Sequence, residues 1–181
     1  MRRQTGHILL PTRRRIDVAK LARTCRPPWR PWARGALARA ERTADGRIHL
    51  VVVRASRGGV EVRVTGVNAR QTQILAPIAA RVYRAIGPSL GPGRSLRGTS
   101  AFEDAVLAML ADDPAARRRL LALERGCPSA PALRVFPDAG TLASLSPTTL
   151  ARIAGGRDRG RRLHALARAF VALAPSAPRT S

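Results

Sequence analysis

The sequence predicts an α+β fold: a small antiparallel sheet with a covering helix, followed by a region built only from helices. Apolar residues run through 47–54 and alternate with polar residues over 60–65, on either side of a Gly-rich turn, which is typical of a β-hairpin. Residues 69–86 carry apolar side chains at helical spacing, so this helix is expected to cover one face of the sheet. Beyond residue 100 the sequence contains helix start and stop signals but no strand pattern.

Composition shifts divide the chain into five expected segments. They are a basic Pro/Trp/Arg-rich extended segment (1–35), a small α+β domain of strand hairpin and helix (36–87), a Gly/Pro-rich linker (88–99), a helical domain (100–174) and a tail (175–181). The prolines of the first segment disfavour a helix, because each fixes φ and restricts the residue before it. Its tryptophans, Trp29 and Trp32, either anchor the segment to the core or stack on nucleic-acid bases, and the anchor is favoured.

Start signals divide the helical region into five expected helices. A capping box begins the first helix at Ser100, with Glu103 three residues later. Asp113 followed by proline begins the second helix, which is expected to stop at Gly126. The remaining helices are expected to start at Pro137-Asp138, at Ser146-Pro147 with an end at Gly155-Gly156, and at Asp158 with an amphipathic basic run to Leu173.

Positive charge dominates the composition. Arginine and lysine total 33 against 11 acidic residues, which gives a net charge of +22, and Lys20 is the only lysine. A GC-rich genome explains the choice of arginine over lysine, but it does not explain the shortage of acids. Because guanidinium groups bind phosphate bidentately, nucleic acid is the favoured partner, ahead of an acidic membrane surface or a protein.

Arginines in the linker and on the last helix are the expected DNA contacts. The linker residues lie in a Gly-rich stretch, and the others cover the polar side of the amphipathic helix. These residues are Arg94, Arg97, Arg157, Arg159, Arg161 and Arg162.

The sequence does not carry a recognisable catalytic or metal-binding pattern. Cys25 and Cys127 form no C-x-x-C pair, and His7, His49 and His164 have no metal-ligand spacing. We therefore expect reduced structural thiols, no metal, no cofactor and no catalytic residue. The only apolar run near the N-terminus is too short for a signal peptide, and no stretch reaches transmembrane length, which predicts a cytoplasmic, nucleoid-associated bacterial protein without membrane contact.

The order of these features resembles the helix-hairpin-helix DNA glycosylases, in particular the 3-methyladenine branch. Most of the chain takes part in the resemblance, although no single motif is unique. The similar stretches are Ile16 to Ala19 with Thr24, Phe102 to Val106, Phe136-Pro137 with Leu142 and Leu145-Ser146, Leu150, Gly155-Gly156 and residues 161–167. The resemblance implies a small sheet domain before a helical domain, duplex DNA with a damaged base as the partner, and hydrolysis of the bond between an alkylated base and its sugar.

Two departures from the family pattern bear on function. The family's phosphate-binding hairpin and catalytic aspartate would both lie after Leu173, so the chain is expected to be a truncated, incomplete glycosylase-like protein, inactive alone, with an exposed apolar face or a protein partner that supplies the missing helices. Asp112 and Asp113 stand where relatives tend to carry amides, Thr or Asn, and carboxylates there would repel phosphate. For Asp113 the favoured alternative is a helix N-cap.

Two further functions stay open at this point. In one, the chain is a non-catalytic basic nucleic-acid-binding or interaction protein that uses its Arg-rich helix and N-terminal segment. In the other, it folds into an incomplete domain without activity. Only the glycosylase lineage predicts a preference for damaged duplex, because a poorly paired base is easier to flip out.

Overall fold

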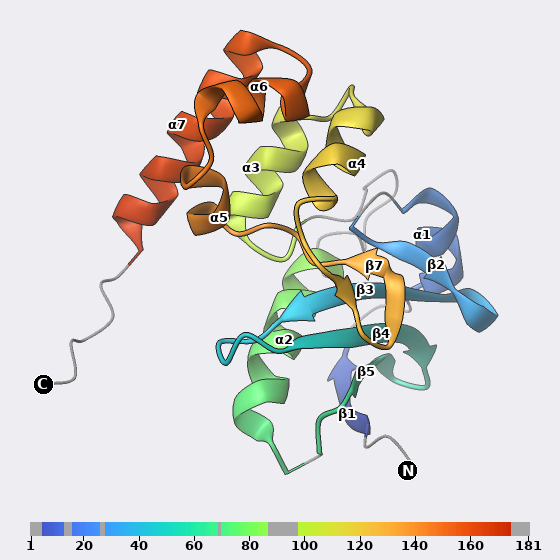
Figure 1. The fold of residues 1–181 in the computed structure, drawn as a ribbon. Coiled ribbons are helices and arrows are strands. Elements are labelled where there is room, and N and C mark those ends of the chain that lie inside the picture. The colour runs from blue at the N-terminus through green and yellow to red at the C-terminus, as the bar shows by residue number, and fades with distance from the viewer. Residues whose placement is uncertain (1–4, 13–15, 26–27, 69, 87–97, 175–181) are drawn as a thin grey trace, which may run out of the picture. The chain divides into compact units, whose positions relative to one another are not determined.

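A computed structural model gives the fold of the chain (Figure 1). It describes residues 5–12, 16–25, 28–68, 70–86 and 98–174. The chain divides into two compact units. The first, here called the sheet unit, comprises Met1–Ser100 and Leu121–Phe136; the second, the helical unit, comprises Ala101–Leu120 and Pro137–Ser181. Most of the predicted linker, including Arg94 and Arg97, lies outside the described residues.

The sheet unit is built on a five-stranded antiparallel sheet in the order β1-β5-β4-β3-β2 (Figure 1). Its strands are β1 (Thr5–Pro11), β2 (Arg30–Trp32), β3 (Ala36–Arg42), β4 (Ile48–Ser56) and β5 (Gly59–Thr65). The β4–β5 pair is the predicted hairpin, with Val53 opposite Val62. Gly58 in its turn has a φ of 85°, a conformation that glycine adopts without steric cost. The predicted α+β class is confirmed.

Two helices cover one face of this sheet. They are α1 (Val18–Thr24) and α2 (Thr72–Ile86), which is the predicted covering helix. Alternate β5 residues point inward because side chains of a strand alternate between its two faces. The core on this side contains valines of β4 and β5 together with Leu37, Trp29, Leu75, Ile78 and Val82.

A second hairpin covers part of the opposite face. It consists of β6 (Gly126–Cys127) and β7 (Ala130–Arg134). Its apolar residues pack on the small alanines of β3 and on Leu50 and Val52 of β4; they are Cys127, Ala130, Leu133 and Val135. Glu124 ties the hairpin to the sheet through an ion pair with Arg42, and Arg134 Nη1 donates to the carbonyl of Glu124 at 2.5 Å.

This hairpin corrects the sequence prediction in one region. A helix was expected to continue to Gly126, and all of 100–174 was expected to be helical. Instead α4 ends at Leu121 and Leu121–Phe136 belongs to the sheet unit. The physical reason is that Pro128 and Pro131 cannot continue a helix, whereas the short strands bury Cys127 and Leu133 on the sheet.

The N-terminal segment also differs from its prediction. It was expected to lie extended over the body, but β1 is an edge strand paired with β5, and α1 is a helix. Asp17 caps α1, with its Oδ1 accepting from the N–H of Lys20 at 2.8 Å. The helix has only seven residues, too few for a clear apolar period. The strand β3, which the sequence analysis did not assign, alternates alanines with Leu37, Arg39 and Glu41.

The helical unit consists of five helices in its described part, close to the predicted ones. They are α3 (Ala101–Met109), α4 (Pro114–Leu121), α5 (Ala139–Ala143), α6 (Pro147–Ala154) and α7 (Arg157–Leu173). The predicted caps of α5 and α6 are confirmed: Asp138 accepts from the N–H of Thr141 at 2.7 Å, and Ser146 Oγ accepts from the N–H of Thr149 at 3.1 Å. The core includes an edge-to-face contact of Phe102 with Phe170, whose ring centroids are 5.3 Å apart.

None of the described helices is long and apolar enough to cross a membrane.

Candidate nucleic-acid interface

The α6–α7 hairpin carries most of the arginines that the sequence analysis selected. Gly155 ends α6 with a φ of 76°, and its N–H is bonded to the carbonyl of Ala151, as in a left-handed C-cap. Gly156 then begins α7 in an extended conformation. Gly160 lies so close to α6 that a Cβ built on it would be 2.4 Å from the nitrogen of Ala151. The two helices therefore form a tightly packed hairpin, which fixes the direction of the side chains along α7.

Asp113 lies at the centre of the contacts that tie α4 to this hairpin. Its Oδ1 accepts from the N–H of Ala116 at 2.7 Å, so the predicted N-cap is confirmed. Its Oδ2 lies 3.7 Å from Arg119 Nη2 and 3.5 Å from Arg159 Nη1. The hydrogen bond from Ala116 and the charges of Arg119 and Arg159 lower the pKa of Asp113. The negative charge of Asp113 is thus balanced inside the unit and does not form a separate acidic surface.

Arg159 is one of the predicted DNA contacts, but the structure gives it internal partners. Besides Asp113, its guanidinium lies 3.3 Å from Asp112 Oδ2 and donates to the carbonyl of Ala154 at 3.4 Å. Arg119 acts similarly, with its Nε donating to the carbonyl of Ile153 at 2.9 Å. Both cations therefore lie at the C-terminus of α6, where the helix dipole favours positive charge. Arg159 positions the hairpin, and a phosphate contact would have to compete with these bonds.

The other predicted arginines of α7 are exposed to solvent. Within the described part of the chain, Arg157 and Arg162 form no ion pair or hydrogen bond, and Arg161 has one weak contact, 3.7 Å from Asp158 on the same helix, with 70% of its side chain exposed. Helical spacing places Arg157, Arg161 and Arg168 on one side of α7. We call these three residues the α7 arginine stripe. Arg168 was not among the expected DNA contacts, although its distance of seven residues from Arg161 indicates that the two share one side of the helix.

The acidic residues have structural partners throughout the chain. All 11 of them are among the described residues, and each has at least one interaction partner. The two cysteines are unpaired thiols, and burial raises the pKa of Cys25. The described residues contain no group of three His, Cys, Asp or Glu that could hold a metal ion.

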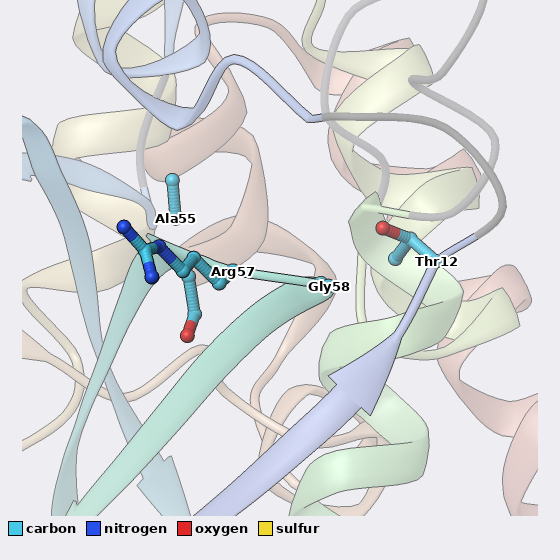
Figure 2. Close-up of a pocket in the computed structure, with 6 residues that line it drawn as sticks. Thr12, Ala55, Arg57 and Gly58 are labelled. Atoms are coloured by element: carbon cyan, nitrogen blue, oxygen red, sulfur yellow. The ribbon is translucent and has the colours of Figure 1, made fainter.

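A hollow of about 610 Å³ opens at the tip of the β4–β5 hairpin. Figure 2 shows Arg57 at the turn and Thr12 just beyond β1, and the lining is completed by Ala55, Ser56, Gly58 and Gly59. Arg57 is the only charged residue among these lining residues. Gly59 has no room for a side chain, because a Cβ there would be 2.1 Å from the carbonyl oxygen of Leu10. The described lining of the hollow offers hydroxyls and one cation, and it contains neither an acidic residue nor a histidine.

Comparison with known proteins identifies the class of fold. The chain matches no family model and no curated protein sequence. Among solved structures, the 3-methyladenine DNA glycosylase from Archaeoglobus fulgidus is similar, with a TM-score of 0.67 and 13% sequence identity. The similarity covers 90% of this chain and 66% of that glycosylase. The chain therefore has the fold of this part of a 3-methyladenine DNA glycosylase, in agreement with the resemblance inferred from the sequence.

Replacement of Asp113 by alanine is expected to lower the melting temperature at neutral pH by a few degrees, because α4 loses its cap and two arginines lose their shared partner. The folded-state pKa of Asp113 lies below its unfolded value, so this stabilisation is complete above the unfolded pKa and is lost as the pH falls through the folded pKa. The difference from wild type should therefore shrink below about pH 4 in thermal unfolding followed by circular dichroism.

The matched control is Asp112→Ala, since this neighbouring side chain is 75% exposed and its ion pair in the described part of the chain is with Arg159. We expect a much smaller effect there, and equal shifts for the two variants would contradict the role assigned to Asp113.

Proposed function

We propose that this chain binds duplex DNA as a DNA-repair protein of the 3-methyladenine DNA glycosylase type. The observation that carries the proposal is the structural similarity to the A. fulgidus enzyme, which extends over 90% of the chain. The net charge of +22 supports the same partner, because it attracts a polyanion such as DNA.

The α7 arginine stripe is the surface that we assign to the phosphate backbone. From Arg157 to Arg168 it extends about 16 Å along the helix axis, at about 1.5 Å per residue. Successive phosphates of one strand are spaced about 3.4 Å along the duplex axis, so the stripe is long enough to neutralise several of them. Among the described residues its members have at most one weak ion-pair partner, so binding DNA breaks few bonds that the described fold needs.

The position of these arginines is unfavourable for the helix itself. Arg157 and Arg161 lie in the first two turns of α7, where the positive end of the helix dipole disfavours cations. Helix stability thus offers no reason for placing arginines there. A bound phosphate would be attracted both by the guanidinium groups and by the dipole, which supports an anionic partner at this end of α7.

The proposal covers binding of DNA and does not include the family reaction, which is release of an alkylated base. The chain spans 66% of the similar glycosylase, and its own carboxylates are engaged in caps and ion pairs. We propose damage-selective binding, because a site that accepts a flipped base gains most from a base that is already poorly paired.

The test is fluorescence anisotropy with a labelled duplex, intact or containing an alkylated or abasic-analogue site, at several salt concentrations. The triple variant Arg157→Gln, Arg161→Gln, Arg168→Gln is expected to bind about 10- to 100-fold more weakly, with a salt slope reduced by about 3. Assay of base release on the same duplexes shows whether the chain also excises the base.

A control variant that loses the same number of positive charges distinguishes the α7 arginine stripe from a general effect of net charge. Arg47, Arg70 and Arg125 are exposed, and replacing all three by glutamine also removes three charges. Little loss is expected in this control. Equal losses in the two triple variants would reject the stripe, and no binding of any duplex at low salt would reject the proposed function.

A further inference from the structure

The two tryptophans of the N-terminal segment have different environments. Trp29 is only 2% exposed, and the guanidinium of Arg39 lies over its ring, 5.2 Å from the centroid. It anchors the segment, as the sequence analysis favoured. Trp32 is 36% exposed, although it lies only three residues further along the chain. The anchor explanation therefore accounts for Trp29 but does not explain why an indole is kept at the surface at position 32.

Arg30 and Trp32 project from the same face of the edge strand β2. They pair with Ala38 and Ala36 of β3, whereas Pro31 between them pairs with Leu37, which points into the core on the other face. Alternate residues of a strand are about 6.6 Å apart, so the guanidinium and the indole stand side by side. Both side chains are exposed, and Arg30 forms no ion pair or hydrogen bond with any residue that the structure describes.

The surroundings of this pair are positively charged. Arg54 of β4 alternates with Leu50 and Val52, which places it on the same sheet face as Arg30 and Trp32. Arg54 is half-buried, and among the described residues it has no ion-pair partner and none that bonds its solvent-shielded Nε. On the same face, the carboxylate of Glu61 is already paired, with Arg63 Nε and His7 Nδ1 each 3.0 Å from its Oε1.

We propose that β2 is a binding site for single-stranded DNA, with an unpaired base stacked on Trp32 and the adjoining phosphate held by Arg30. A single strand offers both an anionic backbone and accessible base faces, whereas the bases of a duplex are stacked on one another. An indole with a neighbouring guanidinium provides both complementary groups. The site belongs to the sheet unit and uses none of the residues of the α7 arginine stripe.

Tryptophan fluorescence tests this site directly, with a 12-residue oligo-dT as the probe. Stacking is expected to quench Trp32, so wild type should lose fluorescence on titration, whereas Trp32→Phe, which keeps only Trp29, should show no quenching. In anisotropy with labelled oligo-dT, Trp32→Ala and Arg30→Gln are each expected to weaken binding about tenfold. Binding of a duplex of the same length should change less than twofold.

Leu9→Ala is the matched control for loss of exposed apolar surface, since Leu9 is 53% exposed on the other edge strand. It should leave oligo-dT binding unchanged, and urea unfolding of every variant verifies that the sheet is intact. Equal quenching in Trp32→Phe and wild type, or oligo-dT binding that falls only in the α7 triple variant, would overturn this site and leave the proposed function standing. Loss of duplex binding alone in the α7 variant, with Trp32 quenching kept, would support both.

Discussion

Replacement of Glu41 by glutamine is expected to lower the free energy of unfolding by about 3–5 kcal/mol, because it leaves a buried cation without its counter-charge. Glu41 is 5% exposed, with its Oε1 2.6 Å from Arg39 Nε and its Oε2 3.2 Å from Arg81 Nε. Arg39 is 2% exposed and cannot reach bulk water, so its guanidinium would keep only the Trp29 ring and its remaining polar contacts. Urea unfolding followed by circular dichroism measures the change.

Two comparison variants make this result specific. Arg47→Gln removes an exposed pair with Asp45, whose atoms are 3.5 Å apart, and should cost at most about 1 kcal/mol. The double variant Arg39→Met with Glu41→Leu removes both charges together, and it is expected to be more stable than Glu41→Gln alone because no uncompensated charge stays buried. A loss below about 1 kcal/mol for Glu41→Gln would contradict the structural role of this ion pair.

The same buried pair shows why part of the sheet could not be predicted from the sequence. β3 reads Ala-Leu-Ala-Arg-Ala-Glu-Arg, and its charged residues at alternate positions suggest a solvent-exposed face. In the structure Arg39 and Glu41 are buried as an ion pair, and Arg81 of α2, 40 residues away in sequence, adds a second cation 3.2 Å from Glu41 Oε2. The burial therefore depends on an element distant in sequence, which the local pattern does not reveal. By contrast, the β4–β5 hairpin and α2 depend on local apolar periodicity, so they were predicted within a few residues.

The candidate site was predictable to a similar degree. Amphipathic spacing indicated that α7 carries arginines on its polar side, and the structure exposes Arg157, Arg161 and Arg162. Sequence could not distinguish Arg159 from these, because its partners Asp112 and Asp113 are 47 and 46 residues away, respectively. Both aspartates could have repelled DNA, although an N-cap was the favoured interpretation of Asp113. In the structure Asp113 is that cap, and both aspartates form ion pairs with Arg159 of the hairpin.

Replacement of Gly160 by alanine is expected to destabilise the helical unit by about 3 kcal/mol, although the same change normally stabilises a helix by about 1 kcal/mol. The Cβ at this position would lie 2.4 Å from the nitrogen and 2.5 Å from the Cα of Ala151, and 2.9 Å from the carbonyl carbon of Leu150. These are backbone atoms of α6, so no side-chain rotation can relieve the overlap, and the two helices must move apart. The unfolding free energy from urea titration tests this expectation.

Gly140→Ala is the control in the same unit, because this helical glycine has room for a Cβ. This glycine lies in α5, and a Cβ there would meet only Asp138 Oδ1, at an ordinary contact distance of 3.4 Å. Its replacement should therefore be neutral or stabilising by up to about 1 kcal/mol. Opposite signs for the two variants would establish that close helix approach, rather than helix propensity, requires glycine at position 160. Because the arginine stripe lies on α7, a Gly160→Ala protein that stays folded should also bind duplex DNA less tightly. Unchanged stability and unchanged DNA binding would contradict the inference that the tightly packed α6–α7 hairpin positions the stripe.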